Sequence, residues 1–252
     1  MAGYGYLGGR IAALLRGENF GVTVITRSVK NADTHTTRGS NFICCNLARN
    51  APALQLHEFD AAVFCLAPGQ RAHGTEAYKL TYCDAQRNFL QAFSARYYVF
   101  ISSTAVYPDA PGNYDEAMAA AHSERAEILL AAEQIALAQK NSCVLRLAGL
   151  YSAERPIYRH ETVYARDKLV HFIHREDAAR AAVHAVKKQL TGIYNVHDGH
   201  PQLRSTILNS QRAGQLRAGA AATRLLDCGK IFASGFNVMY ADYFAGIQEV
   251  QN

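Results

Sequence analysis

The sequence predicts an α/β protein: a doubly wound parallel sheet with helices on both faces and a small mixed C-terminal part. Near-continuous apolar runs recur along the chain, which is typical of parallel strands buried on both faces. Stretches of helical spacing alternate with these runs. The 252 residues, 49% hydrophobic and 19% charged, can bury a sizeable core and exclude a disordered, collagen-like or coiled-coil chain.

The first half of the chain opens on a predicted helix over residues 8–18, because Ile11, Leu14 and Leu15 fall on one face of it. A long, aromatic-rich helix is expected over residues 75–95. Strands are predicted over residues 22–26, 42–45, 61–66 and 97–102. The second half continues this alternation, with strands predicted over 143–148 and 193–196. Helices are predicted over 123–139, with Ser123 as the N-cap, and over 177–190, with Asp177 as the N-cap.

A G-x-G-x-x-G motif precedes the first helix and consists of Gly3, Tyr4, Gly5, Tyr6, Leu7 and Gly8. Its glycines let the backbone turn tightly and approach a pyrophosphate, to which the helix N-terminus offers free N–H groups and partial positive charge. We therefore predict a dinucleotide-binding loop, with an ordinary glycine-rich turn as the alternative.

Only Met1 and Ala2 precede this motif, where the first strand of such a sheet normally supplies a longer run. We therefore expect a first strand that is truncated or absent. Three explanations stay open: a misplaced gene start, a trimmed chain, or a protein that binds its cofactor poorly.

Arg27 and Ser28 follow the 22–26 strand, at the position where an Asp or Glu would favour NAD. Arg27 can bind the 2′-phosphate of NADP through two parallel donors, and Ser28 can donate a hydroxyl. The sequence thus predicts NADP as the cofactor, with NAD as the alternative. The alternative interpretation of Arg27 is a solvated charge at the end of a strand, with no role in cofactor binding.

Hydroxyl side chains end the 97–102 strand, namely Ser102, Ser103 and Thr104, and Tyr107 follows them. Doubly wound sheets bind ligands at the carboxyl ends of their strands. We therefore predict a functional edge here, with polar strand caps of no function as the alternative.

Together these motifs give the chain a resemblance to the extended short-chain dehydrogenase/reductases of the NAD-dependent epimerase/dehydratase family. The resemblance runs over nearly the whole chain, and the further segments that carry it are Leu66-Ala67-Pro68 and residues 115–116, 145–151, 173–179, 194–199 and 235–236. It implies a Rossmann fold, with a dinucleotide-binding core over 1–150 and the remaining sheet elements and a small substrate-binding part over 151–252. It also implies an NAD(P)-dependent, epimerase- or dehydratase-like oxidoreductase that acts on a small molecule.

The resemblance assigns roles to single residues. Ser103, with Thr104 beside it, would carry catalysis by hydrogen bonding to a substrate hydroxyl, and Tyr107 and Arg125 are the candidates for substrate binding. Cofactor binding would fall to the glycine motif, Arg27, Ser28, Leu66, Ala67, Pro68 and Ser102.

The Tyr-x-x-x-Lys pair of that family, which supplies a general acid/base, is missing. If Glu133 is matched to the Glu that follows the pair, Arg125 stands at the Tyr position and Leu129 at the Lys position. A leucine side chain carries no charge that could shift the pKa of a neighbour, and an arginine stays protonated, so it is a poor general acid. We therefore expect non-standard catalytic residues. The alternative is a dinucleotide-binding sensor or partner-binding protein with little or no turnover.

Composition sets the remaining expectations. The net charge of +5 is spread thinly and no apolar run could span a bilayer, so neither nucleic acid nor a membrane is an expected partner. The six cysteines lack metal-site spacing, and His171 and His174 stand without further ligands, so we expect no metal. With no signal peptide, free thiols and a cytoplasmic location are expected. The resemblance also allows a homodimer through helices 75–95 and 123–139.

Overall fold

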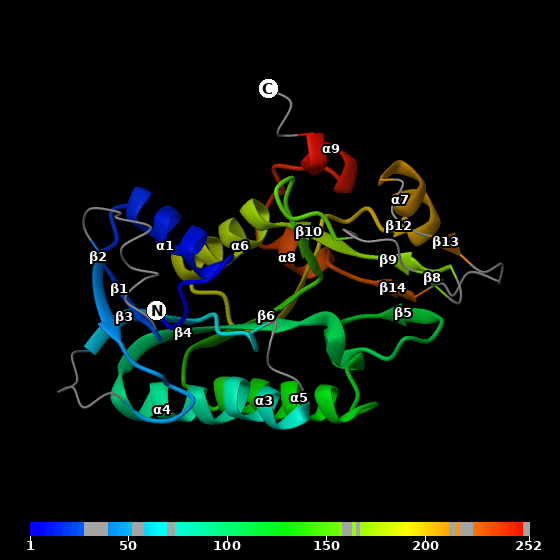
Figure 1. The fold of residues 1–252 in the computed structure, drawn as a ribbon. Helices are drawn as coiled ribbons and strands as arrows, with labels where there is room; N and C mark the ends of the chain where they lie inside the picture. The colour runs from blue at the N-terminus through cyan, green and yellow to red at the C-terminus, as the bar shows by residue number, and fades with distance from the viewer. Residues whose placement is uncertain are drawn as a thin grey trace.

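The computed structural model describes residues 1–27, 40–51, 58–69, 74–157, 163–164, 167–211, 215–216 and 224–248. Its centre is a parallel sheet in two blocks (Figure 1). The strands of the first block are β2 (Ser40–Cys44) and β1 (Val22–Thr26), and those of the second, in order, are β3 (Glu58–Phe64), β4 (Ser94–Ser103), β6 (Ser142–Leu147) and β11 (Gly192–Val196). The predicted α/β fold is confirmed.

Helices cover both faces of this sheet (Figure 1). One face carries α1 (Gly8–Gly17) and α6 (Arg175–Lys188), and the other carries α3 (Thr75–Lys79), the π-helical turn Leu80–Asp84, α4 (Ala85–Ala92) and α5 (Glu124–Leu137). A buried apolar cluster lies between the sheet and each helical layer. The central strands β4 and β6 therefore bury both of their faces, which explains their continuous apolar runs in the sequence.

Two sequence predictions about helices need correction. The expected helix over 75–95 is divided by its π-helical turn. The helix predicted to start at Asp177 starts at Arg175, because the Nδ1 atom of His174 accepts the N–H of Glu176 and caps it. Asp177 instead accepts the backbone N–H groups of Met239 and Tyr240, at 2.6 and 3.0 Å. Ser123 caps α5 as predicted, by accepting the N–H of Ala126.

The C-terminal part is built from short paired segments beyond the carboxyl ends of the sheet (Figure 1). The pairs are β5 (Gly112–Tyr114) with β14 (Arg224–Leu226), β7 (Gly149–Tyr151) with β10 (Phe172–His174), β8 (Val163–Tyr164) with β13 (Gln215–Leu216), and β9 (Leu169–Val170) with β12 (Gln202–Leu203). The helices of this part are α7 (Arg204–Gln211), α8 (Gly229–Ala233) and α9 (Tyr243–Ile247). Across the described ranges, no helix is long and apolar enough to cross a bilayer.

The first strand is reduced to residues 1–3, as the sequence predicts. Ala2 bridges both blocks, since its N–H donates to the carbonyl of Val63 and its carbonyl accepts from Cys65. On the other side, Ile25 donates to the carbonyl of Met1 and accepts from the N–H of Gly3. These bonds hold β1 and β3 one strand apart.

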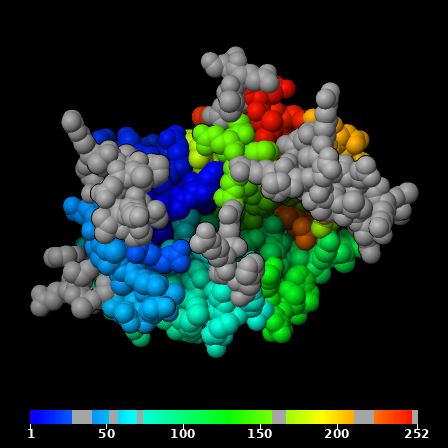
Figure 2. All heavy atoms as spheres, in the orientation of Figure 1, coloured from blue at the N-terminus to red at the C-terminus, as the bar shows by residue number. Residues whose placement is uncertain are grey.

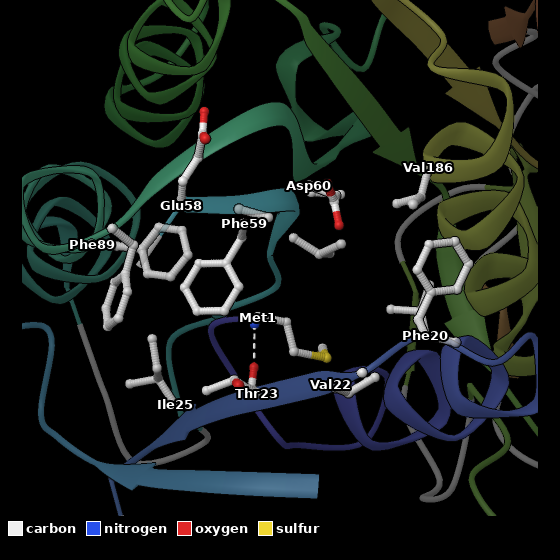
Figure 3. A pocket seen from close by; sticks show the side chains of 16 residues that line it. Met1, Phe20, Val22, Thr23, Ile25, Glu58, Phe59, Asp60, Phe89 and Val186 are labelled. Atoms are coloured by element: carbon white, nitrogen blue, oxygen red, sulfur yellow. Dashed lines mark hydrogen bonds between the residues drawn. The ribbon is translucent and has the colours of Figure 1, made fainter. Parts of the chain in front are cut away.

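A cavity of about 170 Å³ lies between β1 and β3, next to Met1 of the short first strand. Figure 3 shows Met1 among the lining residues, with the amino nitrogen donating to the carbonyl of Thr23 at 2.5 Å. The lining combines Phe20, Phe59 and Phe89 with the carboxylates of Glu58 and Asp60. We call this hollow the first-strand cavity.

Candidate functional site

A cleft of about 530 Å³ opens over the carboxyl ends of the central strands. On the face drawn in Figure 2, the blue N-terminal segment and the light green segment near residue 150 lie side by side. The cleft is lined by residues 3–8, Thr26, Arg27, residues 65–69, Tyr82, Ile101, Ser102, Ser103, Leu147, Ala148, Leu150 and Arg155. This set contains no carboxylate and two arginines, so the cleft favours an anionic ligand.

The three glycines of the G-x-G-x-x-G motif serve different purposes. Gly3 has a φ of +97°, and a Cβ there would lie 2.6 Å from the carbonyl oxygen of Cys65. A Cβ on Gly8 would lie 2.3 Å from the carbonyl oxygen of Gly3. A Cβ on Gly5, by contrast, would meet no described atom within 4 Å. Packing of the chain therefore requires Gly3 and Gly8, whereas Gly5 leaves open space beside the loop.

The first turn of α1 follows this loop directly, and the N–H groups of Gly9 and Arg10 donate to the carbonyls of Gly5 and Leu7. No described side chain caps the helix, and its first turn carries no acidic residue. The positive end of the helix dipole suits a phosphate or pyrophosphate. Gly5 supplies the room and α1 supplies the positive end of its dipole, so the loop fits the pyrophosphate of a dinucleotide.

The strand ends beside the loop carry the other predicted cofactor residues. Arg27 is exposed at the end of β1, and its Nη2 atom lies 3.9 Å from where a Cβ of Gly69 would stand. Leu66, Ala67 and Pro68 line the cleft. Cys65 lines it too, and burial raises the pKa of its thiol to about 12, which keeps the thiol protonated. Ser28 lies outside the described residues.

The two serines at the end of β4 are held differently. Ser102 is buried and donates to Oε1 of Glu133 at 2.6 Å. The Oγ atom of Ser103 accepts the N–H of Ala105 at 3.2 Å, so its own hydrogen stays available to a ligand. Thr104 is buried and is not among the cleft residues. Of the predicted catalytic pair, the structure brings Ser103 alone to the cleft surface.

A buried ion pair lies beneath these serines. Arg146 binds Glu133 through two nearly parallel bonds, from Nε to Oε1 at 3.0 Å and from Nη2 to Oε2 at 2.7 Å. Its Nη1 atom donates to the hydroxyl of Tyr107 at 2.8 Å, and that hydroxyl donates to Oδ1 of Asn195 at 2.7 Å. Burial raises the pKa of Tyr107 despite the neighbouring Arg146. These bonds hold the carboxylate of Glu133 in place, so the hydroxyl of Ser102 donates to an acceptor whose position is fixed.

Several residues singled out from the sequence lie away from the cleft. Tyr107 is 1% exposed, and its hydroxyl is fully engaged in the buried network. Arg125 is exposed on α5, with its guanidinium 4.9 Å from the ring centre of Tyr78. Leu129 packs in the apolar core. No described side chain of α5 lines the cleft, so this helix presents no general acid/base there.

The cleft also contains residues that the sequence analysis did not predict as site residues, and Tyr82 and Arg155 are the two with large polar side chains. Tyr82 comes from the π-helical turn, and burial raises the pKa of its phenol, which makes it a poor proton carrier near neutral pH. Arg155 comes from the segment after β7. The rule that ligands bind at carboxyl ends of strands could have drawn attention to Arg155, whereas no sequence signal marks Tyr82.

All six cysteines are free thiols in the structure. Within the ranges that the structure describes, no three His, Cys, Asp or Glu side chains are grouped to hold a metal ion. His171 and His174 are both buried, and His171 accepts the N–H of Leu226.

Comparison with known proteins agrees with this geometry. A family model described as the NAD dependent epimerase/dehydratase family matches residues 2–166. A solved structure from Methylobacillus flagellatus, named for NAD-dependent epimerase/dehydratases, is 24% identical, with a TM-score of 0.75 over 97% of this chain and 94% of that one. No curated protein matches the sequence.

Two further solved structures share the fold. The enzyme WbmH of Bordetella bronchiseptica, solved with NAD⁺, is 18% identical with a TM-score of 0.75, over 98% of this chain and 94% of that one. The ADP-L-glycero-D-manno-heptose-6-epimerase of Helicobacter pylori is 17% identical with a TM-score of 0.69, over 98% and 93%.

Proposed function

The chain belongs to the NAD dependent epimerase/dehydratase family, and from this premise we propose that it is an NAD(P)-dependent, epimerase-like oxidoreductase. The observation that carries the proposal is the open space at Gly5, above the uncapped N-terminus of α1, in a cleft without carboxylates. When bound there, a nicotinamide dinucleotide supplies the hydride chemistry. The chain's own residues supply the binding and the orientation.

Ser103 is the residue proposed to meet the substrate. Its hydroxyl hydrogen is free while its oxygen is held by the N–H of Ala105, so it can donate to a substrate oxygen in a fixed direction. The neighbouring Ser102 is tied to Glu133 and keeps the end of β4 in place. The substrate is a small molecule. A cytoplasmic location and a homodimer also belong to the proposal, and the free cysteines support the location.

A second candidate is a dinucleotide-binding protein with little turnover. The observation in its favour is that Leu129 is buried where the family places its Lys, and that the described part of α5 brings no proton carrier to the cleft. Loss of a positioned general acid/base typically slows a reaction by ~10²–10⁴-fold. Steady-state assays of hydride transfer and epimerisation on UDP-sugars discriminate the two candidates, since the second predicts tight cofactor binding without turnover.

We further propose NADP rather than NAD as the cofactor, with Arg27 as the discriminating residue. An exposed guanidinium at the end of β1 can donate two parallel bonds to the 2′-phosphate, and each such charge-assisted bond contributes roughly 1.5–3 kcal/mol. Wild type should therefore bind NADPH at least ~10-fold more tightly than NADH, and Arg27→Ala should remove most of this preference.

Fluorescence titration of both reduced cofactors into wild type and Arg27→Ala measures this directly. Arg16→Ala serves as the matched control, because Arg16 lies in the last turn of α1, away from the cleft. Equal affinity of wild type for NADH and NADPH, or a ratio that Arg27→Ala leaves unchanged, contradicts the role of Arg27. Binding of neither cofactor contradicts the proposed function itself.

A further inference from the structure

Arg155 lies over the glycine motif, and the contact runs through Tyr6. The guanidinium carbon of Arg155 is 4.8 Å from the centre of the Tyr6 ring, within cation–π range. Tyr6 stands between Gly5 and Gly8, directly ahead of α1. Arg155 therefore reaches the cleft from the segment after β7, whereas Arg27 reaches it from the end of β1.

A second arginine packs on the same ring but differs in its surroundings. The guanidinium carbon of Arg175 is 4.9 Å from the Tyr6 ring centre, and its Nη1 atom lies 3.4 Å from the carboxylate of Glu154. Arg175 is not among the residues that line the cleft, whereas Arg155 is. Within the described ranges, no carboxylate is paired with Arg155. The charge of Arg155 is thus left for a ligand.

The backbone of Arg155 is fixed although its side chain is exposed. Its N–H donates to the carbonyl of Ser152 at 3.0 Å, and the N–H of Ser152 donates to the carbonyl of Arg155 at 3.2 Å. The Oγ atom of Ser152, a buried residue, also accepts the Arg155 N–H, at 3.2 Å. This closed turn, together with the Tyr6 ring, limits where the guanidinium can move. A positioned donor loses less conformational entropy on binding than a free one.

We propose that Arg155 binds the pyrophosphate of the dinucleotide. The Arg155 guanidinium lies over the Tyr6 ring in the same cleft as the glycine motif, and it offers a planar fork of donors that matches phosphate oxygens. The inference rests on the proposed function, because it assigns a further residue to that same cleft. It also explains why Tyr6, a large side chain, occupies the loop: its ring supports the arginine.

The test is calorimetric titration of NADPH, NADH and ADP-ribose, which carries the pyrophosphate without a nicotinamide. Arg155→Met retains apolar contact with Tyr6 but lacks the charge, and it should bind all three ligands at least ~10-fold more weakly. Arg155→Lys keeps the charge without the fork and should lose less. Arg175→Ala is the matched control and should change affinity by less than about twofold, since exposed ion pairs contribute little. Thermal unfolding checks that each variant is folded.

Each result decides the inference. Wild-type affinity in Arg155→Met means that Arg155 only packs on Tyr6, and an equal loss in Arg175→Ala means that the ring, not the charge, is what matters. Either outcome overturns the role of Arg155 and leaves the proposed function standing. Binding of ADP-ribose that depends on Arg155, without binding of NADH or NADPH, supports Arg155 and contradicts the proposed function. If wild type binds none of the three ligands, both are overturned.

Discussion

The hollow at the carboxyl ends of the central strands and the hollow at their amino ends are lined by different kinds of residue. The cleft at the carboxyl ends has two arginines and no carboxylate, whereas the first-strand cavity at the amino ends has the carboxylates of Glu58 and Asp60 beside Phe20, Phe59 and Phe89. Beneath the cleft, polar groups are bonded to one another, as around Glu133. The two hollows therefore differ in the sign of their lining charges, and only the cleft has the positive charge that suits an anionic ligand.

The largest expected effect is on stability, and it compares a buried ion pair beneath the cleft with an exposed ion pair beside the first-strand cavity. Glu133→Ala leaves Arg146 buried without its partner, and should lower the free energy of unfolding by ~3–5 kcal/mol. Urea unfolding at neutral pH measures it. The matched change at the amino ends, Glu58→Ala, breaks an exposed pair with Arg96 and should leave the unfolding midpoint unchanged. Equal midpoints for the two variants would show that burial does not distinguish the pairs.

The second prediction separates binding from packing within the cleft. Gly5→Ala places a methyl group in open space, so the protein should fold normally but lose dinucleotide affinity by ~10-fold or more, because the methyl occupies the approach of the pyrophosphate. Gly3→Ala, by contrast, forces a Cβ against the carbonyl of Cys65 at a positive φ and should lower stability as well. Calorimetric titration and thermal unfolding of both variants check this. Undiminished affinity in Gly5→Ala argues against a ligand at the loop.

The smallest effect is expected in the first-strand cavity. Ala61→Val adds apolar volume to its lining, on strand β3 where a β-branched residue fits, and should raise the free energy of unfolding by ~0.5–2 kcal/mol. Cofactor affinity should stay at the wild-type value, since Ala61 is remote from the cleft lining. Urea unfolding and titration measure the two quantities. A destabilised Ala61→Val would mean that the cavity cannot accept the added atoms.

The sequence predicted best what depends on neighbouring residues. The glycine motif, the buried strands and the Ser123 cap follow from local spacing and local hydrogen bonds, and the structure has them as expected. The predicted cap at Asp177 was wrong. The carboxylate of Asp177 accepts two backbone N–H groups from residues 239–240, and His174 caps the helix instead. No local pattern could foresee a partner so distant in the chain.

The candidate site was predicted in part for the same reason. Ser103 and Arg27 stand at ends of strands that the apolar runs reveal. Arg155 and Tyr82 reach the cleft only because the segment after β7 and the π-helical turn pack against the glycine motif and the sheet. The hydroxyl of Tyr107 lies in the interior because Arg146 and Asn195 bind it there, which its place in the serine motif does not reveal.

The short first strand has a consequence for cooperativity. Among the described residues, the backbone hydrogen bonds that join the β2–β1 block to the β3–β4–β6–β11 block all run through Met1, Ala2 and Gly3. The packing of Val24 and Ile25 in the two apolar clusters joins the blocks as well. Arg27 follows β1 of the smaller block, and Ser103 ends β4 of the larger. A ligand that contacts both residues adds a further connection between the blocks, so its binding should slow amide exchange in β1.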